Sequence, residues 1–212
     1  TMTFAQVLPY QDQTLPIDER IEDLLGRMTL EEKLAQIKHI RTNHYDNKGS
    51  ADLAKMQKNL DGMSRGCMEA FPYSLQQYVD AVYAIQKDMK ENTRLGIPVI
   101  PVVEGLHGVV QDGCTIYPQA IAQSATFSPE LIEEMGYQIA LEARSIGAWQ
   151  ILSPCLDIAR ELRWGRIEET FGEDPFMNAI NGTAYVRGAQ RAGAICTPKH
   201  FVAHGSPVGG VN

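Results

Sequence analysis

The chain has 212 residues, of which 44% are hydrophobic and 21% are charged, and its formal net charge is −7. The apolar content disfavours a disordered chain, and the acidic balance argues against a nucleic acid or an anionic membrane as partner. No run approaches the roughly 18 apolar residues that a membrane-spanning helix needs.

Helical patterns dominate the first hundred residues. Residues 1–16 form a lead-in. Its first six residues are either the remnant of a secretory signal or an arbitrary start. A secretory signal would place the protein in the periplasm or outside the cell. Apolar residues at three- and four-residue spacing then predict a helix up to Met28, and Thr29 with Glu32 has the spacing of a capping box that opens a second helix. The remaining expectations here are helices at 51–60 and 75–93 and a weak strand within 62–68.

The second half of the chain alternates between strands and helices. Short apolar runs predict buried strands at 97–103, 148–156 and 193–198, and cap signals predict helices at 128–146 and 174–192. This alternation is typical of a parallel sheet covered by helices, the α/β class. Because no Gly-rich phosphate loop follows these strands, a nucleotide-binding doubly wound sheet is disfavoured.

Polar residues gather where the predicted strands end. Glu104 follows the first, Asp157 and a loop that includes Arg166 follow the second, and Lys199-His200 follows the third. Convergence of such groups at the carboxyl ends of parallel strands is the arrangement of a (β/α)8 TIM-barrel active site. Since such a barrel takes about 250 residues, we expect 17–212 to be only the N-terminal part of the barrel domain.

The loop at 163–175 and the Lys199-His200 pair are the candidate binding elements. In the loop, Trp164 offers a flat face on which a sugar could stack, and we expect at least one Arg–Glu pair to hold the loop in shape. Adjacent side chains on a strand point to opposite faces, which leaves open whether Lys199 and His200 both reach the site.

The sequence gives little indication of a metal site or a cofactor site. The four cysteines lack any paired spacing, so we expect buried free thiols. His204 follows His200 at a helical metal-ligand spacing, but Gly205-Ser206-Pro207 prevents a helix there. We therefore predict no metal site and no cofactor.

Four stretches resemble the N-terminal domain of glycoside hydrolase family 3. They are RLGIPVIPVVEGLHGV, YPQAIAQSATFSPELIEEMG, LSPCLDIARELRWGRIEETFGEDPF and CTPKHFVAHGSP, and the opening RIEDLLGRMTLEEKLAQ is similar to the usual start of the family. The resemblance runs from about Ile17 to Asn212. It implies a (β/α)8 barrel and a retaining exo-acting β-glycosidase, a β-glucosidase or a β-xylosidase, that removes terminal sugars from oligosaccharides or other β-glycosides.

The resemblance also assigns roles to individual residues. Glu104, Arg166, Lys199 and His200 match positions that bind the terminal sugar, and Asp157 matches a structural position. The family's nucleophilic Asp lies on a later strand, beyond Asn212, and its acid/base residue lies in a second α/β domain. No residue of this chain is therefore assigned a catalytic role, and we expect the chain alone to be inactive and the remainder of the protein to be its partner.

Two positions depart from the family pattern: the first leaves the sugar open, and the second loses a backbone constraint but no evident catalytic group. Many relatives have Asp in place of Glu104, and Asp-Pro in place of Glu161-Leu162. The longer Glu104 side chain could crowd an exocyclic CH₂OH group, which keeps a xyloside as well as a glucoside under consideration.

Other functions remain as alternatives. A β-N-acetylhexosaminidase of the same family would lack the WGRIEETFGEDP stretch. A metal-dependent barrel hydrolase would need His and Asp ligands at strand ends, and the H-x-H pattern is missing. A catalytically inert carbohydrate-binding fragment is the third alternative.

Overall fold

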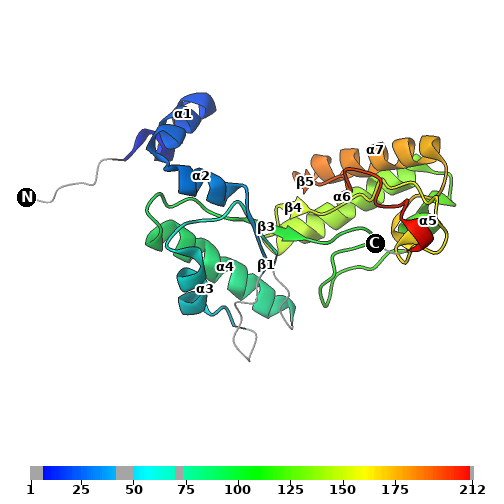
Figure 1. Ribbon diagram of the computed structural model, residues 1–212, viewed down its shortest axis with the longest axis horizontal. Helices are drawn as coiled ribbons and strands as arrows, with labels where there is room; N and C mark the ends of the chain where they lie inside the picture. The colour runs from blue at the N-terminus through cyan, green and yellow to red at the C-terminus, as the bar shows by residue number, and fades with distance from the viewer. Residues whose placement is uncertain (1–6, 42–49, 70–73, 211–212) are drawn as a thin grey trace, which may run out of the picture.

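Short parallel strands run through the middle of the elongated molecule (Figure 1). The computed structural model describes residues 7–41, 50–69 and 74–210. Within them, one sheet contains β1 (His39–Arg41), β2 (Cys67–Glu69), β3 (Ile100–Val103), β4 (Gln150–Ile151) and β5 (Ile195–Cys196). Every neighbouring pair is parallel, and the order in the sheet is the order in the chain, β1-β2-β3-β4-β5.

Helices connect the successive strands. The α-helices are α1 (Ile17–Arg27), α2 (Leu30–Gln36), α3 (Leu53–Leu60), α4 (Leu75–Asn92), α5 (Ala120–Ser124), α6 (Pro129–Ser145) and α7 (Pro175–Arg191), and the short 3-10 helices are η1 (Pro9–Gln11), η2 (Ile167–Glu169) and η3 (Val208–Gly210). A doubly wound sheet reverses its strand order at a switch point, whereas a barrel adds each strand next to the previous one. The strand order here is that of a barrel, as the alternation in the sequence predicted.

Capping side chains start the helices where the sequence predicted. Thr29 and Glu32 form the reciprocal capping box of α2. Ser128 accepts a hydrogen bond from the Leu131 N–H at the start of α6, and Asp174 accepts one from the Phe176 N–H at the start of α7. Each of these oxygens satisfies a backbone donor that the first helical turn leaves without a partner.

The strands are shorter than the apolar runs that predicted them. The predictions of 97–103, 148–156 and 193–198 were too long, since the ladders cover only β3, β4 and β5. Pro98, Pro154 and Pro198 interrupt the three runs, and proline has no N–H to donate to a ladder. The sequence analysis missed β1, whose three residues are mostly basic, and α5, which is too short to show a period.

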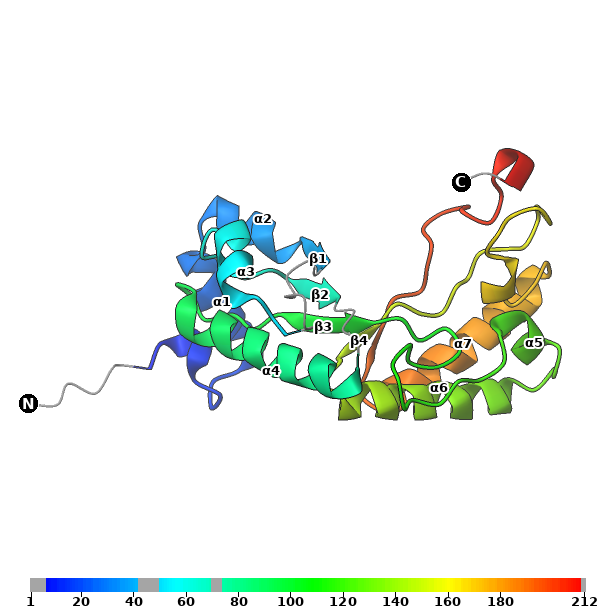
Figure 2. The same cartoon turned by 90° about the horizontal axis from the view of Figure 1, so that it is seen from below.

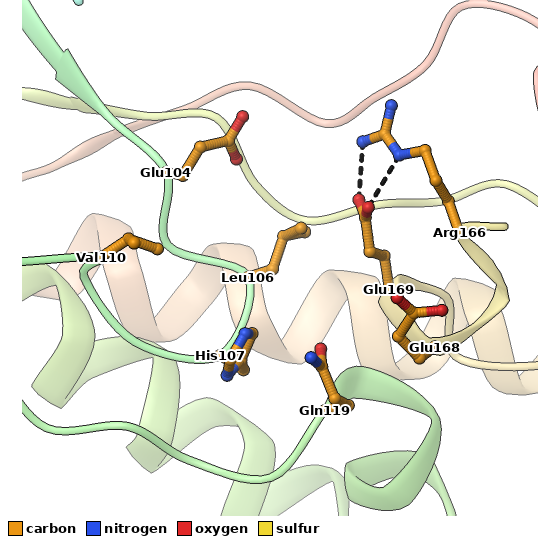
Figure 3. Close-up of a pocket in the computed structure, with 8 residues that line it drawn as sticks. All are labelled: Glu104, Leu106, His107, Val110, Gln119, Arg166, Glu168 and Glu169. Carbon is orange, nitrogen blue, oxygen red and sulfur yellow. Dashed lines mark hydrogen bonds and ion pairs between the residues drawn. The ribbon is translucent and has the colours of Figure 1, made fainter. Parts of the chain in front are cut away.

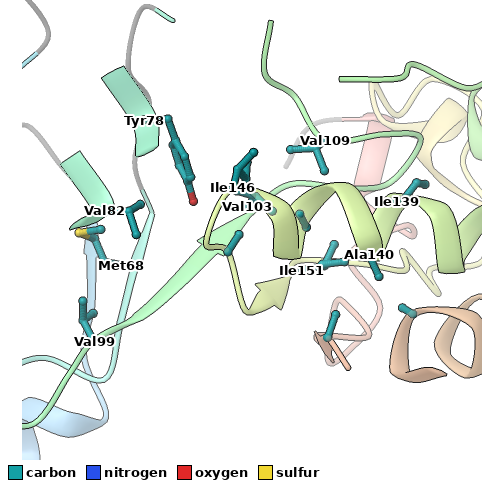
Figure 4. Packing of buried hydrophobic residues seen from close by; sticks show 14 of the residues in the cluster. Met68, Tyr78, Val82, Val99, Val103, Val109, Ile139, Ala140, Ile146 and Ile151 are labelled. Carbon is teal, nitrogen blue, oxygen red and sulfur yellow. The ribbon is translucent and has the colours of Figure 1, made fainter. Parts of the chain in front are cut away.

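The core lies between the sheet and the helices α4, α6 and α7 (Figure 4). Met68, Val103 and Ile151 contribute from the strands, and helix side chains such as Tyr78 and Ile139 meet them. Burial of these apolar groups supplies the main driving force for the fold. Within the described residues, no helix has both the length and the apolarity to cross a bilayer.

Helices α6 and α7 lie side by side along the molecule (Figures 1 and 2). Glycines make this approach possible. A Cβ on Gly188 would lie 1.9 Å from the Glu133 carbonyl oxygen, and one on Gly136 would lie 2.7 Å from the Tyr185 carbonyl oxygen. The obstacles are backbone atoms of the facing helix, so no side-chain rotation could relieve the clash.

We expect Gly188→Ala to reduce the free energy of unfolding by about 3 kcal/mol, because the added methyl group must push α6 and α7 apart. Gly26→Ala in α1 is the matched control, since a Cβ there meets nothing within 4 Å. The control should raise the stability by about 0.5–1 kcal/mol through helix propensity. Urea unfolding of both variants measures the difference, and equal effects would show that α6 and α7 are not packed this closely.

Candidate functional site

The predicted site residues meet at the carboxyl edge of the sheet. Glu104 directly follows β3, Asp157 and Arg166 lie on the loop after β4, and Lys199 and His200 follow β5. The parallel strands end on one side, so loops from three successive strands reach the same place.

Glu104 and Lys199 form a partly buried ion pair. The Lys199 Nζ lies 3.1 and 2.9 Å from the two carboxylate oxygens of Glu104, with the lysine side chain 11% exposed and the glutamate 32% exposed. Two backbone hydrogen bonds fix Lys199 beside the loop after β4: its N–H donates to the Pro154 oxygen, and its carbonyl accepts from the Leu156 N–H. The pair thus ties the ends of β3 and β5 together across β4.

The loop that carries Glu104 can take its path only with glycine at two positions. A Cβ on Gly105 would lie 2.5 Å from the Cγ2 of Ile151, and Gly108 has a φ of 126° with the Thr115 oxygen 2.2 Å from its virtual Cβ. The buried Tyr185 hydroxyl of α7 donates to the Gly105 carbonyl. These contacts explain the spacing of EGLHG and hold Glu104 in place.

Asp157 is a buried carboxylate, only 4% exposed, that holds the loop after β5. Its Oδ2 accepts from the Nδ1–H of His200 at 2.7 Å and from the His200 backbone N–H at 3.1 Å, and its Oδ1 accepts from the Gly205 N–H at 3.1 Å. Burial alone would raise the pKa of Asp157, but hydrogen bonds from His200, Cys155 and Gly205 outweigh it and hold the pKa below its usual value. The structural position implied by the family resemblance agrees with this geometry.

The predicted Arg–Glu pairs hold the loop after β4 in shape. Arg166 donates from Nε and Nη2 to the two carboxylate oxygens of Glu169, at 2.7 and 2.6 Å, and Arg163 pairs with Glu161 in the same way. The pKa of Arg166 is raised, first by its hydrogen bonds to Glu169 and further by the negative charge of Glu104.

Trp164 does not have the role that the sequence suggested. We expected its indole to stack on a sugar, but the side chain is only 2% exposed and packs against the edge of the His204 ring, with the ring centroids 5.2 Å apart. A buried indole has no free face to offer a ligand.

A cleft of about 310 Å³ opens between the loops after β3 and β4 (Figure 3). It is lined by Glu104, Leu106, His107, Val110, Gln119, Arg166, Glu168 and Glu169. Glu104 and Arg166 line this cleft. Lys199 and His200 are not among its lining residues. Lys199 contacts the lining residue Glu104, and the His200 ring contacts His204, which in turn contacts the lining residue Arg166.

Six of the eight lining residues were not identified from the sequence as binding candidates, among them the polar residues His107, Gln119 and Glu168. His107 was interpreted as loop-shaping, and its Nδ1 does lie 3.1 Å from the Tyr117 oxygen, yet the ring also borders the cleft. Gln119 and Glu168 both lie in stretches that resemble the family, but the sequence did not predict that they line the cleft, because their approach depends on the path of two loops. The buried Oε1 of Gln119 has no hydrogen-bond partner among the described residues.

In the described part of the chain, one group of potential metal-ligating atoms lies close together. Atoms of Cys155, Asp157 and His200 all lie within 4.8 Å of one another. Burial raises the pKa of the Cys155 thiol to about 12, so the sulfur stays protonated, and Asp157 already accepts hydrogen bonds on both oxygens. These donors are better suited to a hydrogen-bonded cluster than to a cation.

All four cysteines are free, but the expectation that all are buried holds for Cys155 alone, since the other three are partly exposed.

The comparisons identify the class of protein that this barrel and cleft represent. A β-glucosidase from Erythrobacter marinus superposes with a TM-score of 0.84 at 32% identity, covering 96% of this chain and 28% of that one. A β-glucosidase from Listeria innocua gives a TM-score of 0.75 at 29% identity, covering 91% of this chain and 28% of that one. The fold is thus the (β/α)8-type N-terminal domain found in glycosyl hydrolases.

The sequence places the chain in one family of these enzymes. Residues 29–211 match the model of the glycosyl hydrolase family 3 N-terminal domain, and the chain belongs to this family. A putative β-xylosidase from Formosa agariphila is 32% identical over 99% of this chain and 30% of its own length. A periplasmic β-glucosidase from Salmonella typhimurium is 30% identical over 91% of this chain and 24% of its own length. The chain therefore spans about a third or less of these relatives.

Asp157→Asn should lower the free energy of unfolding at pH 7 by about 2 kcal/mol, since charge-assisted hydrogen bonds to a buried carboxylate are lost. The folded-state pKa is lowered, so this contribution is present above the usual value near 3.9 and is lost as the pH falls through the folded pKa. The gap in melting temperature between wild type and variant should shrink below about pH 4.

The control for this pH series is Asp112→Asn, which makes the same change at an exposed position. It should leave the melting temperature nearly unchanged across the series. A gap for Asp157→Asn that is independent of pH would contradict the assignment of a buried, ionised carboxylate.

Proposed function

We propose that this chain is part of a retaining, exo-acting β-glycosidase that removes a terminal, non-reducing β-linked sugar. A β-glucosidase is the first choice and a β-xylosidase the close second. The single observation that carries the proposal is the meeting of Glu104, Arg166 and Lys199 at the carboxyl edge of the sheet, in and beside one polar cleft. The names of the relatives, β-glucosidases and β-xylosidases, support the same class.

The donors and acceptors left free in this cluster suit the hydroxyl groups of a sugar. A carboxylate accepts about four hydrogen bonds, so Glu104 retains capacity after binding Lys199. The Lys199 ammonium has three protons, and at least one is left for a hydroxyl. Vicinal hydroxyls both donate and accept, so a mixed set of charged acceptors and donors matches them better than it would match an anion.

The chemistry itself would need groups from outside this chain. A retaining enzyme places two carboxyl groups about 5–5.5 Å apart, one as nucleophile and one as acid/base. In the loop after β4, Glu169 is bound to Arg166 and Asp174 caps α7, so both have structural tasks. We propose that the nucleophilic Asp lies beyond Asn212, on a later strand, and that the acid/base residue lies in a second domain. The role proposed for this chain is to bind and orient the terminal sugar.

We further propose a periplasmic or secreted location and a barrel domain that begins near residue 17. Two relatives carry the word periplasmic in their names, which supports this location. Residues 1–6, where a signal remnant was considered, lie outside the described residues.

In the whole protein, Lys199→Ala and Arg166→Ala should each lower kcat/KM for an aryl β-glucoside by roughly two to four orders of magnitude. Charged hydrogen bonds to hydroxyls near the reacting centre strengthen in the transition state, so their loss raises the barrier. The matched control is Arg163→Ala, on the same loop but exposed and paired with Glu161. Steady-state kinetics with thermal unfolding tests this, and near-wild-type kinetics in Lys199→Ala or Arg166→Ala would remove that residue from the site.

Glu104→Asp should shift the ratio of kcat/KM values toward the glucoside over the xyloside by about tenfold. The shorter side chain keeps the charge and frees one methylene of space, which is worth about 1–3 kcal/mol in a tight pocket. Nitrophenyl glucoside and nitrophenyl xyloside, compared in wild type and variant, give the ratio directly. If the ratio stays constant, another residue recognises the exocyclic carbon.

A further inference from the structure

His204 lies on the loop after β5. It was not predicted to bind the sugar, and the proposed function assigns no role to it. Its ring packs edge-on against two aromatic rings, with centroid distances of 4.6 Å to His200 and 5.2 Å to Trp164. Its Nε2 lies 3.4 Å from the Nη1 of Arg166. One half-buried imidazole therefore contacts two of the four predicted sugar-binding residues.

The backbone around His204 directs the ring inward. Ala203 has a φ of 69°, a left-handed conformation that turns the chain back on itself. Gly205 then donates its N–H to Asp157, and a Cβ on Gly205 would lie 2.8 Å from the Ile158 oxygen and 3.2 Å from the Trp164 ring. The turn is thus anchored on both Asp157 and Trp164, so the position of His204 is set by the fold.

The contact with Arg166 gives the imidazole the part of acceptor. A guanidinium only donates hydrogen bonds, so in this contact the Nε2 of His204 accepts from Nη1. Glu169 binds the Nε and Nη2 of Arg166, and His204 binds Nη1. All three nitrogens of Arg166 are then held, which leaves two of its N–H donors in a fixed direction.

We propose that His204 is a positioning residue, whose Nε2 contact orients Arg166 toward the sugar. The proposal rests on the proposed function for its kinetic consequence, and on the contacts alone for its structural one. No catalytic step is assigned to His204, since the contacts place it against Arg166 and His200.

Charged groups lie on two sides of His204. Arg166 faces it from the loop after β4, with Glu169 of η2 bound to the far side of the guanidinium. His200 faces it from its own loop, with Asp157 behind that ring. The ring therefore lies between two predicted sugar-binding residues, each of which is also bound to a carboxylate.

Two substitutions of His204 in the whole protein distinguish a role in orienting Arg166 from a role in packing alone. His204→Ala removes the acceptor and should lower kcat/KM at pH 7 by about tenfold, the usual effect of losing a hydrogen bond to a charged group. His204→Gln keeps an acceptor oxygen near the place of Nε2. It should stay within about threefold of wild type at pH 7, because the acceptor for Arg166 is retained. Lys58→Gln, at an exposed position on α3, is the control and should behave as wild type.

The outcomes separate this inference from the proposed function. Wild type that cleaves no aryl β-glycoside overturns the proposed function. Active wild type with an unchanged His204→Ala variant, or with a Gln variant as impaired as the Ala variant, overturns the role of His204.

A measurement without substrate tests the contact itself. In a double-mutant cycle on the free energy of unfolding, the effect of His204→Ala should shrink when Arg166 is replaced by methionine, because the shared hydrogen bond is already absent. Strictly additive effects would contradict the positioning of Arg166 by His204.

Discussion

The hydrogen bonds to the buried carboxylate of Asp157 hold the site together. Asp157 comes from the loop after β4, and its donors His200 and Gly205 come from the loop after β5. An ionised carboxylate with so little exposure is tolerated only because several donors surround it. The same bonds place Lys199, one residue before His200, within reach of Glu104 from β3. One buried charge thus fixes the relation between the ends of three strands.

The proposed sugar site is a network of side chains that are already paired with one another. Lys199 is bound to Glu104, and Arg166 is held by Glu169 and His204. Such pairing reduces the conformational entropy that these long side chains would lose when a ligand binds. It also limits each group to the donors and acceptors left over, which fixes the direction from which a hydroxyl can be bound. We infer that selectivity depends on these directions as much as on the residue types.

The sequence predicted what depends on local pattern. Helix starts such as Thr29, Ser128 and Asp174 were found because a capping side chain acts within three residues. The placement of Glu104, Arg166 and Lys199 followed from a general property of parallel sheets, whose carboxyl ends lie together. What could not be predicted depends on loops folding over one another. Trp164 was expected at the surface and is buried, while the contact of His204 with Arg166 joins residues 38 positions apart.

The proposed function requires a terminal sugar to bind between Glu104, Lys199 and Arg166. A crystal structure of the whole protein with glucose bound would show where the sugar lies. We expect sugar hydroxyls within hydrogen-bond distance of Glu104, Lys199 and Arg166, with the Asp157–His200 and Arg166–His204 contacts unchanged. A sugar bound away from these residues, or a site that forms only after Asp157 and His200 separate, would contradict it.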